Sequence, residues 1–83
     1  MTTVRVLIQS KAGVLDPEGE AVKGGIERLG HEGVERVGVG KVVDIDFETD
    51  DTDEIESRVE QICDEFLVNP IIERYSYEIL DNQ

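Results

Sequence analysis

Residues 37–47 read VGVGKVVDIDF, and their alternation predicts the central strand of a sheet. Val37, Val39, Val43, Ile45 and Phe47 fall at odd positions, while Asp44 and Asp46 fall between them at even positions. A two-residue hairpin inside this stretch would reverse the parity, so the pattern favours one long strand bent at Gly38 or Gly40. A three-residue turn spanning these glycines would keep the parity and remains the alternative. A strand this long exceeds the usual length, and we expect its overhang to pair with another subunit.

A helix from Pro17 to about Leu29 is predicted ahead of this strand, because apolar residues recur there at helical spacing. Asp16 can cap its first free N–H groups, and a proline suits the first helical position. Gly30 is placed to end the helix in a left-handed conformation. The glycine pair at residues 24–25 lowers helix propensity, and we interpret it as a sign of tight packing of this helix against the sheet.

Three further elements complete the order strand, helix, strand, helix, strand. The first strand has an apolar face made by Val4, Val6 and Ile8. The second helix begins at a cap, Asp51 or Thr52, and its apolar stripe predicts core positions at Ile55, Val59, Ile62 and Phe66, with Cys63 and Leu67 beside them. Asn69 and Pro70 end this helix, and residues 71–80 alternate as the last strand.

This order predicts an α+β fold. We expect a two-layer sandwich in which an antiparallel sheet with a long bent central strand carries two helices on one face, arranged β-α-β-α-β or β-α-β-β-α-β. The 83 residues are enough for one domain, residues 1–83. The other face of the sheet is uncovered in a monomer, which favours a homodimer or a higher oligomer.

The composition is strongly acidic, with 20 Asp and Glu residues against 8 Lys and Arg residues. A net charge of −12 argues against nucleic acid and anionic membranes as partners. We interpret the acidity as halophilic adaptation, with mimicry of nucleic acid as the alternative. The chain shows no apolar run of membrane-spanning length and no signal-type opening, so we expect a cytoplasmic protein.

No residue constellation for catalysis is found. The single cysteine, Cys63, and the single histidine, His31, cannot form a zinc site, and Cys63 fits a small buried core residue. The acidic run at residues 44–56 lacks the glycine and the terminal glutamate of a calcium loop. Residues 38–41 lack the Ser or Thr that would follow the lysine of a phosphate loop. The residues therefore indicate an interaction module without a cofactor or metal.

The loop at residues 11–19 reads KAGVLDPEG and contains more than a helix start requires. Asp16 and Pro17 are explained by the helix. Lys11 is not explained by the helix. Val14 and Leu15 are not explained either, because apolar side chains are unexpected in a solvated loop. We interpret these three residues as part of a partner surface.

Three segments together resemble the PurS subunit of phosphoribosylformylglycinamidine synthase: residues 11–19, residues 37–41 and residues 63–73. The resemblance covers nearly the whole chain. It implies a small noncatalytic subunit of an ATP- and glutamine-dependent ligase of purine biosynthesis, which dimerises, bridges the synthetase and glutaminase subunits, and supports ammonia transfer. ATP and magnesium would belong to the large subunit.

Within this resemblance, the partner interface is expected at Lys11, Val14, Leu15, Gly40, Lys41, Asn69 and Glu73. The first five would contact the large subunit, and Asn69 and Glu73 would fix the loop before the last strand. The alternative function is a dimeric ligand-binding regulatory module of ferredoxin-like type.

Overall fold

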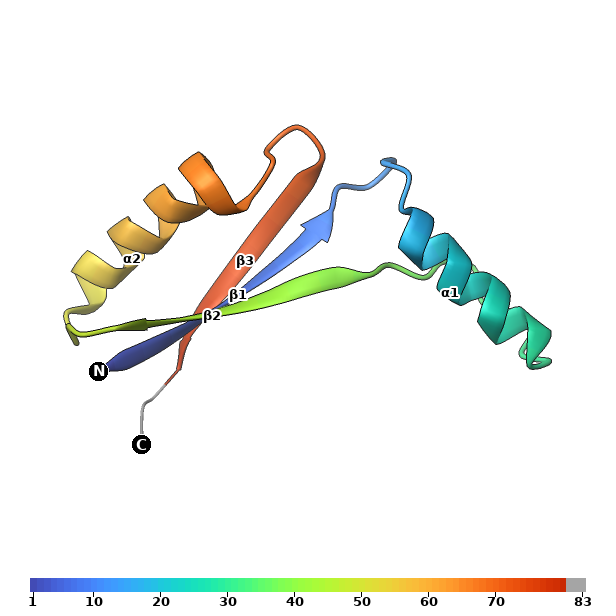
Figure 1. Ribbon diagram of the computed structural model, residues 1–83, viewed down its shortest axis with the longest axis horizontal. Coiled ribbons are helices and arrows are strands. Elements are labelled where there is room, and N and C mark those ends of the chain that lie inside the picture. The colour runs from blue at the N-terminus through green and yellow to red at the C-terminus, as the bar shows by residue number, and fades with distance from the viewer. Residues whose placement is uncertain (81–83) are drawn as a thin grey trace.

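The computed structural model describes residues 1–80, and a three-stranded antiparallel sheet in the order β2-β1-β3 lies at its centre (Figure 1). The elements in chain order are β1 (Thr2–Ser10), α1 (Pro17–Arg28), β2 (Gly40–Phe47), α2 (Thr52–Ile62), a π-helical turn η1 (Cys63–Leu67) and β3 (Glu73–Leu80). The predicted α+β fold with an antiparallel sheet is confirmed, in the first of the two predicted arrangements.

The hydrophobic core lies between α2 with η1 and the inner face of the sheet. The central strand β1 contributes Val4, Val6 and Ile8, which are at most 2% exposed. Their register partners face the same way, Ile45, Val43 and Lys41 on β2 and Ile79, Tyr77 and Tyr75 on β3. From the other layer come the fully buried side chains of Ile55, Val59 and Cys63. The predicted apolar face of the first strand is therefore the inner face of the sheet.

The second helix begins as predicted but ends differently. Asp51 caps α2, since its Oδ1 accepts hydrogen bonds from the backbone N–H groups of Asp53 and Glu54. At the other end, the Val68 N–H donates to the Cys63 carbonyl at 3.1 Å, a five-residue step that adds one residue to the turn. The prediction of Phe66 as a core residue is wrong, because this wider turn leaves its side chain 83% exposed.

The prediction of two helices on one face of the sheet is wrong for α1. Only α2 covers the sheet, and α1 lies beyond the end of the strands (Figure 1). Gly19 is the only buried residue of α1, and Val22 is 45% exposed. The glycine pair is not explained by tight packing either. A Cβ atom at Gly24 or Gly25 would have the Arg28 guanidinium, 3.5 or 3.8 Å away, as its nearest neighbour.

The strand predicted to be central is the edge strand β2, because the sheet order is β2-β1-β3, and it is shorter than predicted. Its pairing with β1 starts at the Gln9–Gly40 pair, so β2 has 8 residues, and residues 31–39 are neither strand nor hairpin. The reason is that β1 ends at Ser10, so residues 37 and 38 lie beyond it in this register, and the Val39 N–H donates to the Asp16 carboxylate instead of to a strand. The parity nevertheless continues, with Val37 and Val39 half-buried and Gly38 and Gly40 exposed.

The segment after α1 returns alongside this helix, and the Lys23 ammonium donates to the Glu35 carbonyl oxygen at 3.0 Å. We call residues 17–39, the helix with its return segment, the arm. The arm makes the chain extended, with a radius of gyration of 16.3 Å. A compact domain of this length would have a radius of gyration of about 12 Å. Neither helix within residues 1–80 has the length and hydropathy that crossing a bilayer requires.

Candidate functional site

The seven predicted interface residues all lie at one end of the sheet. At this end β1 finishes, β2 begins at Gly40 and β3 begins at Glu73, since Gln9 pairs with Gly40 and Ser10 with Glu73. The loop from β1 to α1 and the turn between η1 and β3 emerge here as well (Figure 1). We call this region the loop end.

Three of the predicted residues form one connected group. The Glu73 Oε1 atom accepts a hydrogen bond of 2.9 Å from the backbone N–H of Asn69. The Glu73 Oε2 atom lies 4.0 Å from the Lys41 ammonium. The Asn69 side chain accepts from the Ile71 N–H at 3.1 Å, which shapes the turn. Because the Lys41 side chain is 67% exposed and its ion pair is long, the ammonium remains accessible to a partner.

Gly40 has an architectural explanation at this site. A Cβ atom there would lie 2.6 Å from the Ile8 carbonyl oxygen, a distance that real Cβ atoms do not adopt. A side chain at this position would therefore push β2 away from β1. A direct contact of Gly40 with a partner stays a prediction.

The loop from β1 to α1 is joined to the turn before β3 through its backbone. The Lys11 N–H donates to the Ile72 carbonyl at 2.9 Å, and the Val14 N–H closes a turn onto the Lys11 carbonyl at 3.1 Å. Val14 is half-buried, while Leu15 is 76% exposed. Among the described residues, neither Val14 nor Leu15 shares a hydrogen bond with the group of Lys41, Glu73 and Asn69.

Asp16 fixes the direction in which α1 leaves the loop end. Its Oδ1 atom accepts from the Gly19 N–H and its Oδ2 atom from the Val39 N–H, both at 2.9 Å. These two hydrogen bonds, the one from Val39 first, lower the pKa of the carboxyl group. Gly19 allows the close approach, because a Cβ atom there would collide with the Val37 carbonyl oxygen.

Two exposed apolar side chains at the loop end were not predicted as site residues. Phe66 on η1 is 83% exposed, and Ile71 in the turn before β3 is 80% exposed. A hollow of about 270 Å³, lined by Lys11 and Pro70 among others, connects the first loop with this turn. The spacing of apolar residues could not predict that Phe66 is exposed, since a π turn does not change that spacing. For Ile71 the signal was Pro70, after which the chain makes a further turn before β3 begins.

Comparisons with known proteins agree on one family. The family model PurS, described as phosphoribosylformylglycinamidine (FGAM) synthase, matches residues 3–81. The chain belongs to the PurS family. The PurS subunit of Archaeoglobus fulgidus is 41% identical over 86% of this chain and 89% of that protein.

Solved structures of PurS proteins have the same fold as this chain. The crystal structure of Methanocaldococcus jannaschii PurS superimposes with a TM-score of 0.86 at 31% identity and covers 100% of both chains. A chain of the structure of PurLQS from Thermotoga maritima gives 0.84 at 28% identity, covering 95% of this chain and 96% of that one. The resemblance to PurS inferred from the sequence is thereby confirmed.

The geometry of this PurS-family chain is suited to protein recognition. Cys63 is fully buried, and burial, followed by the charge of Asp64, raises the pKa of its thiol, which disfavours the reactive thiolate. Within residues 1–80, no cluster of three or more His, Cys, Asp or Glu side chains could hold a metal ion. The loop end instead combines exposed apolar side chains with an accessible lysine, the composition of a docking surface.

Proposed function

We propose that this chain is the small noncatalytic subunit of phosphoribosylformylglycinamidine synthase, the ATP- and glutamine-dependent ligase of purine biosynthesis that makes formylglycinamidine ribonucleotide. It bridges the synthetase and glutaminase subunits in the cytoplasm and supports ammonia transfer between them. ATP and magnesium are bound by the synthetase. Membership of the PurS family supports this proposal, as does the likeness to a chain of PurLQS from Thermotoga maritima.

One observation carries the placement of the interface. Leu15 and Ile71 on the loop end, and Phe66 on η1 just before its turn, are each at least 76% exposed. Exposed large apolar side chains gathered in one region mark protein interaction sites. We propose that the synthetase subunit binds there and that Lys11 and Lys41 contribute polar contacts at the rim.

We propose further that the chain self-associates. The arm is the main support, because α1 has 12 residues, no buried apolar side chain and two adjacent glycines. A helix of this length is marginal in water unless its apolar face packs against something. Residues 37–39 continue the parity of β2 beyond its pairing with β1, so apart from the Val39 N–H, which donates to Asp16, their backbone is suited to pair with another copy.

Mixing of purified subunits tests the interface. We expect Lys11→Glu, Leu15→Asp and Phe66→Asp each to reduce co-elution with the synthetase and to lower glutamine-dependent activity in proportion. Ser57→Asp is the matched control for Leu15→Asp and Phe66→Asp, since it adds one negative charge on the exposed side of α2. Unchanged co-elution and activity in all three loop-end variants would overturn the placement. Binding of an amino acid or nucleotide by the chain alone, measured by calorimetry, would favour the regulatory module instead.

A further inference from the structure

The hollow of about 270 Å³ at the loop end lies between η1, the turn before β3 and Lys11, the first residue after β1. We call it the loop-end hollow. Its apolar lining comes from Cys63 and Val68, which are at most 7% exposed, and from Pro70 and Tyr75. Pockets that bind small molecules usually have volumes of about 300–1,000 Å³. The loop-end hollow is below this range, so its size suits one side chain of a partner protein better than a nucleotide.

Two cations of the loop-end hollow are available to a partner. Lys11 and Arg74 both line it, and both residues are exposed. In the part of the chain that the structure describes, neither side chain has a hydrogen bond or an ion pair. The chain has 20 acidic residues against 8 basic ones, so most of its surface repels an acidic protein. Two such cations at one hollow therefore provide a place where the carboxylates of an acidic partner can bind.

The two acids of the hollow already have partners within the chain. The Asp64 carboxylate accepts a hydrogen bond of 3.4 Å from the Tyr75 hydroxyl. The Glu73 carboxylate accepts from the Asn69 N–H and lies 4.0 Å from the Lys41 ammonium. With Lys41 included, three cations surround the hollow and two carboxylates lie among them. The local charge is therefore positive in a chain whose net charge is −12.

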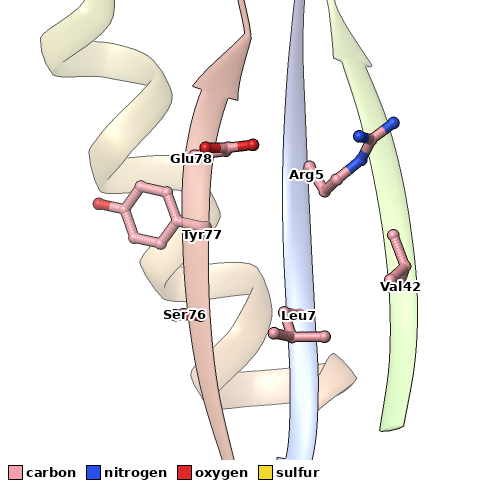
Figure 2. Close-up of a pocket in the computed structure, with 6 residues that line it drawn as sticks. All are labelled: Arg5, Leu7, Val42, Ser76, Tyr77 and Glu78. Carbon is pink, nitrogen blue, oxygen red and sulfur yellow. The ribbon is translucent and has the colours of Figure 1, made fainter.

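The hollow on the face of the sheet that α2 leaves uncovered offers no such charge. Its volume is about 360 Å³, and Figure 2 shows Arg5 and Leu7 on β1 beside Glu78 on β3. Arg5 is the one cation among its lining residues, and its guanidinium already pairs with the Asp44 carboxylate at 2.9 Å. Of these two hollows, the loop-end hollow is the one suited to an acidic partner.

We infer that the loop-end hollow receives one large apolar side chain from an acidic segment of the synthetase subunit, and that Lys11 and Arg74 bind the carboxylates beside that side chain. The inference rests on the proposed function and names the chemistry of the segment that binds at the loop end. An apolar anchor seated in a pocket contributes a large share of the binding energy of an interface. The two cations orient the segment and reduce the repulsion between two acidic proteins.

Filling the hollow is the first test. The chain contains no tryptophan, so Pro70→Trp introduces a single indole at the exposed edge of the hollow. In the free chain this indole occupies the hollow, and its fluorescence emission lies to the blue of that of Ser57→Trp on exposed α2. Titration with the purified synthetase subunit then shows binding weakened about a hundredfold by Pro70→Trp. Pro70→Ala, which removes only the proline ring, weakens binding about threefold, and Ser57→Trp leaves it unchanged. Equal emission of the two indoles, or wild-type affinity of Pro70→Trp, overturns the inference.

Charge substitution is the second test, and it gives the sign of the partner's charge. Lys11→Gln and Arg74→Gln each weaken binding of the synthetase subunit about fivefold. Asp64→Asn keeps an acceptor for the Tyr75 hydroxyl and removes one negative charge, so it strengthens binding about threefold. The titrations use the lowest salt concentration at which circular dichroism shows the wild-type fold, because salt screens these contacts.

The controls change the net charge by the same amounts away from the hollow. Arg28→Gln on α1 and Glu48→Gln beyond the far end of β2 are both at exposed positions and leave the affinity unchanged. Opposite signs at Lys11, Arg74 and Asp64 indicate a basic segment and overturn the inference. If the wild type binds the synthetase subunit and none of the variants alters the affinity, the inference is overturned and the proposed function stands. A wild-type chain that binds neither the synthetase nor the glutaminase subunit overturns both.

Discussion

The Oδ2 atom of Asp16 accepts a hydrogen bond of 2.9 Å from the backbone N–H of Val39, a residue 23 positions later in the chain. The other oxygen of the same carboxylate caps α1 at Gly19. One side chain thus holds the first turn of the arm and the last residue before β2 at a single point. This connection sets the direction in which the arm leaves the sheet.

The two hydrogen bonds of Asp16 can be separated by substitution. Asp16→Asn keeps one acceptor oxygen and Asp16→Ala keeps none, so we expect Ala to expose both amides and Asn to expose one of them. Amide hydrogen exchange at Gly19 and Val39 measures this directly. Wild-type exchange rates at both amides in Asp16→Ala would show that the carboxylate does not hold the arm.

Acid should loosen this connection. The hydrogen bonds lower the pKa of Asp16 below its ordinary value of 3.8, so its contribution to stability is present above that value. It is lost as the pH falls through the lower pKa of the folded state. We expect the melting temperature of Asp16→Asn to decline less steeply below pH 4 than that of the wild type. The same slope of melting temperature against pH below pH 4 in the two proteins would contradict this expectation.

Alanine substitutions at two glycines of α1 should act in opposite directions. Gly19→Ala places a methyl group against the Val37 carbonyl oxygen, and such overpacking costs about 1–3 kcal/mol in the free energy of unfolding. Gly24→Ala places its methyl group 3.5 Å from the Arg28 guanidinium and improves helix propensity, worth about 0.5–1 kcal/mol. Urea unfolding of both variants measures the difference, and a loss of stability in the isolated Gly24→Ala chain would refute the second half.

Truncation of Phe66 should be harmless to the fold although the residue sits on the predicted apolar stripe. Because its side chain is 83% exposed, Phe66→Ala should change the free energy of unfolding by at most about 0.5 kcal/mol. Ile55→Ala, at a fully buried position of the same stripe, should cost about 2–5 kcal/mol. Equal losses for the two variants would mean that Phe66 packs in the core after all.

Alkali should reveal the hydrogen bond between β3 and α2. The Tyr77 hydroxyl donates to the Glu60 carboxylate at 2.9 Å, and this bond, together with burial, raises the pKa of Tyr77 from 10 to about 12. The resulting stability is present below pH 10 and is lost as the pH rises through about 12. Absorbance at the tyrosinate band should show this late transition. Tyr77→Phe should remove this transition, and Glu60→Gln should shift it to lower pH. If the transition persists in Tyr77→Phe, it does not belong to Tyr77.

The folded state should depend on salt. With a net charge of −12, self-repulsion is large in dilute buffer, and molar salt shortens its range to about 3 Å. We expect the melting temperature to rise steadily from dilute buffer to molar potassium chloride and unfolding to begin when salt is removed. Sucrose at equal osmolality is the control, since it does not screen charge. A melting temperature independent of salt would refute the halophilic interpretation.

Local patterns predicted the elements of the fold because each pattern has one dominant cause. Strict alternation at Val4, Val6 and Ile8 gave the buried face of β1, and side-chain capping gave the starts of both helices at Asp16 and Asp51. The partner surface predicted from Lys11 and Leu15, residues that no turn or cap requires, stays a prediction. The structure adds that Lys41, Asn69 and Glu73 are connected there.

The predictions failed where they depended on which surface a helix packs against or which strand another strand pairs with. The spacing of apolar residues in α1 shows that one face is to be covered, but it does not show whether this chain or another covers it. For the same reason the strand predicted to begin at residue 37 begins only at Gly40, which pairs with Gln9 near the end of β1. Phe66 is a different case. Its exposure follows from the hydrogen bond between the Val68 N–H and the Cys63 carbonyl, which the spacing of apolar residues does not predict.

Because of the π turn at η1, the direction of the Phe66 side chain depends on the number of residues between Cys63 and Val68. Deleting Leu67, the residue after Phe66, would turn the five-residue step from Cys63 to Val68 into the four-residue step of an α-helix. In an α-helix the residue three positions after the buried Cys63 lies about 60° from it around the helix axis, so the aromatic ring would turn toward the core. A one-residue deletion would thus convert a proposed docking residue into a packing residue with no change in amino-acid identity at the position. The length of this segment, as much as its composition, is therefore open to selection for partner binding.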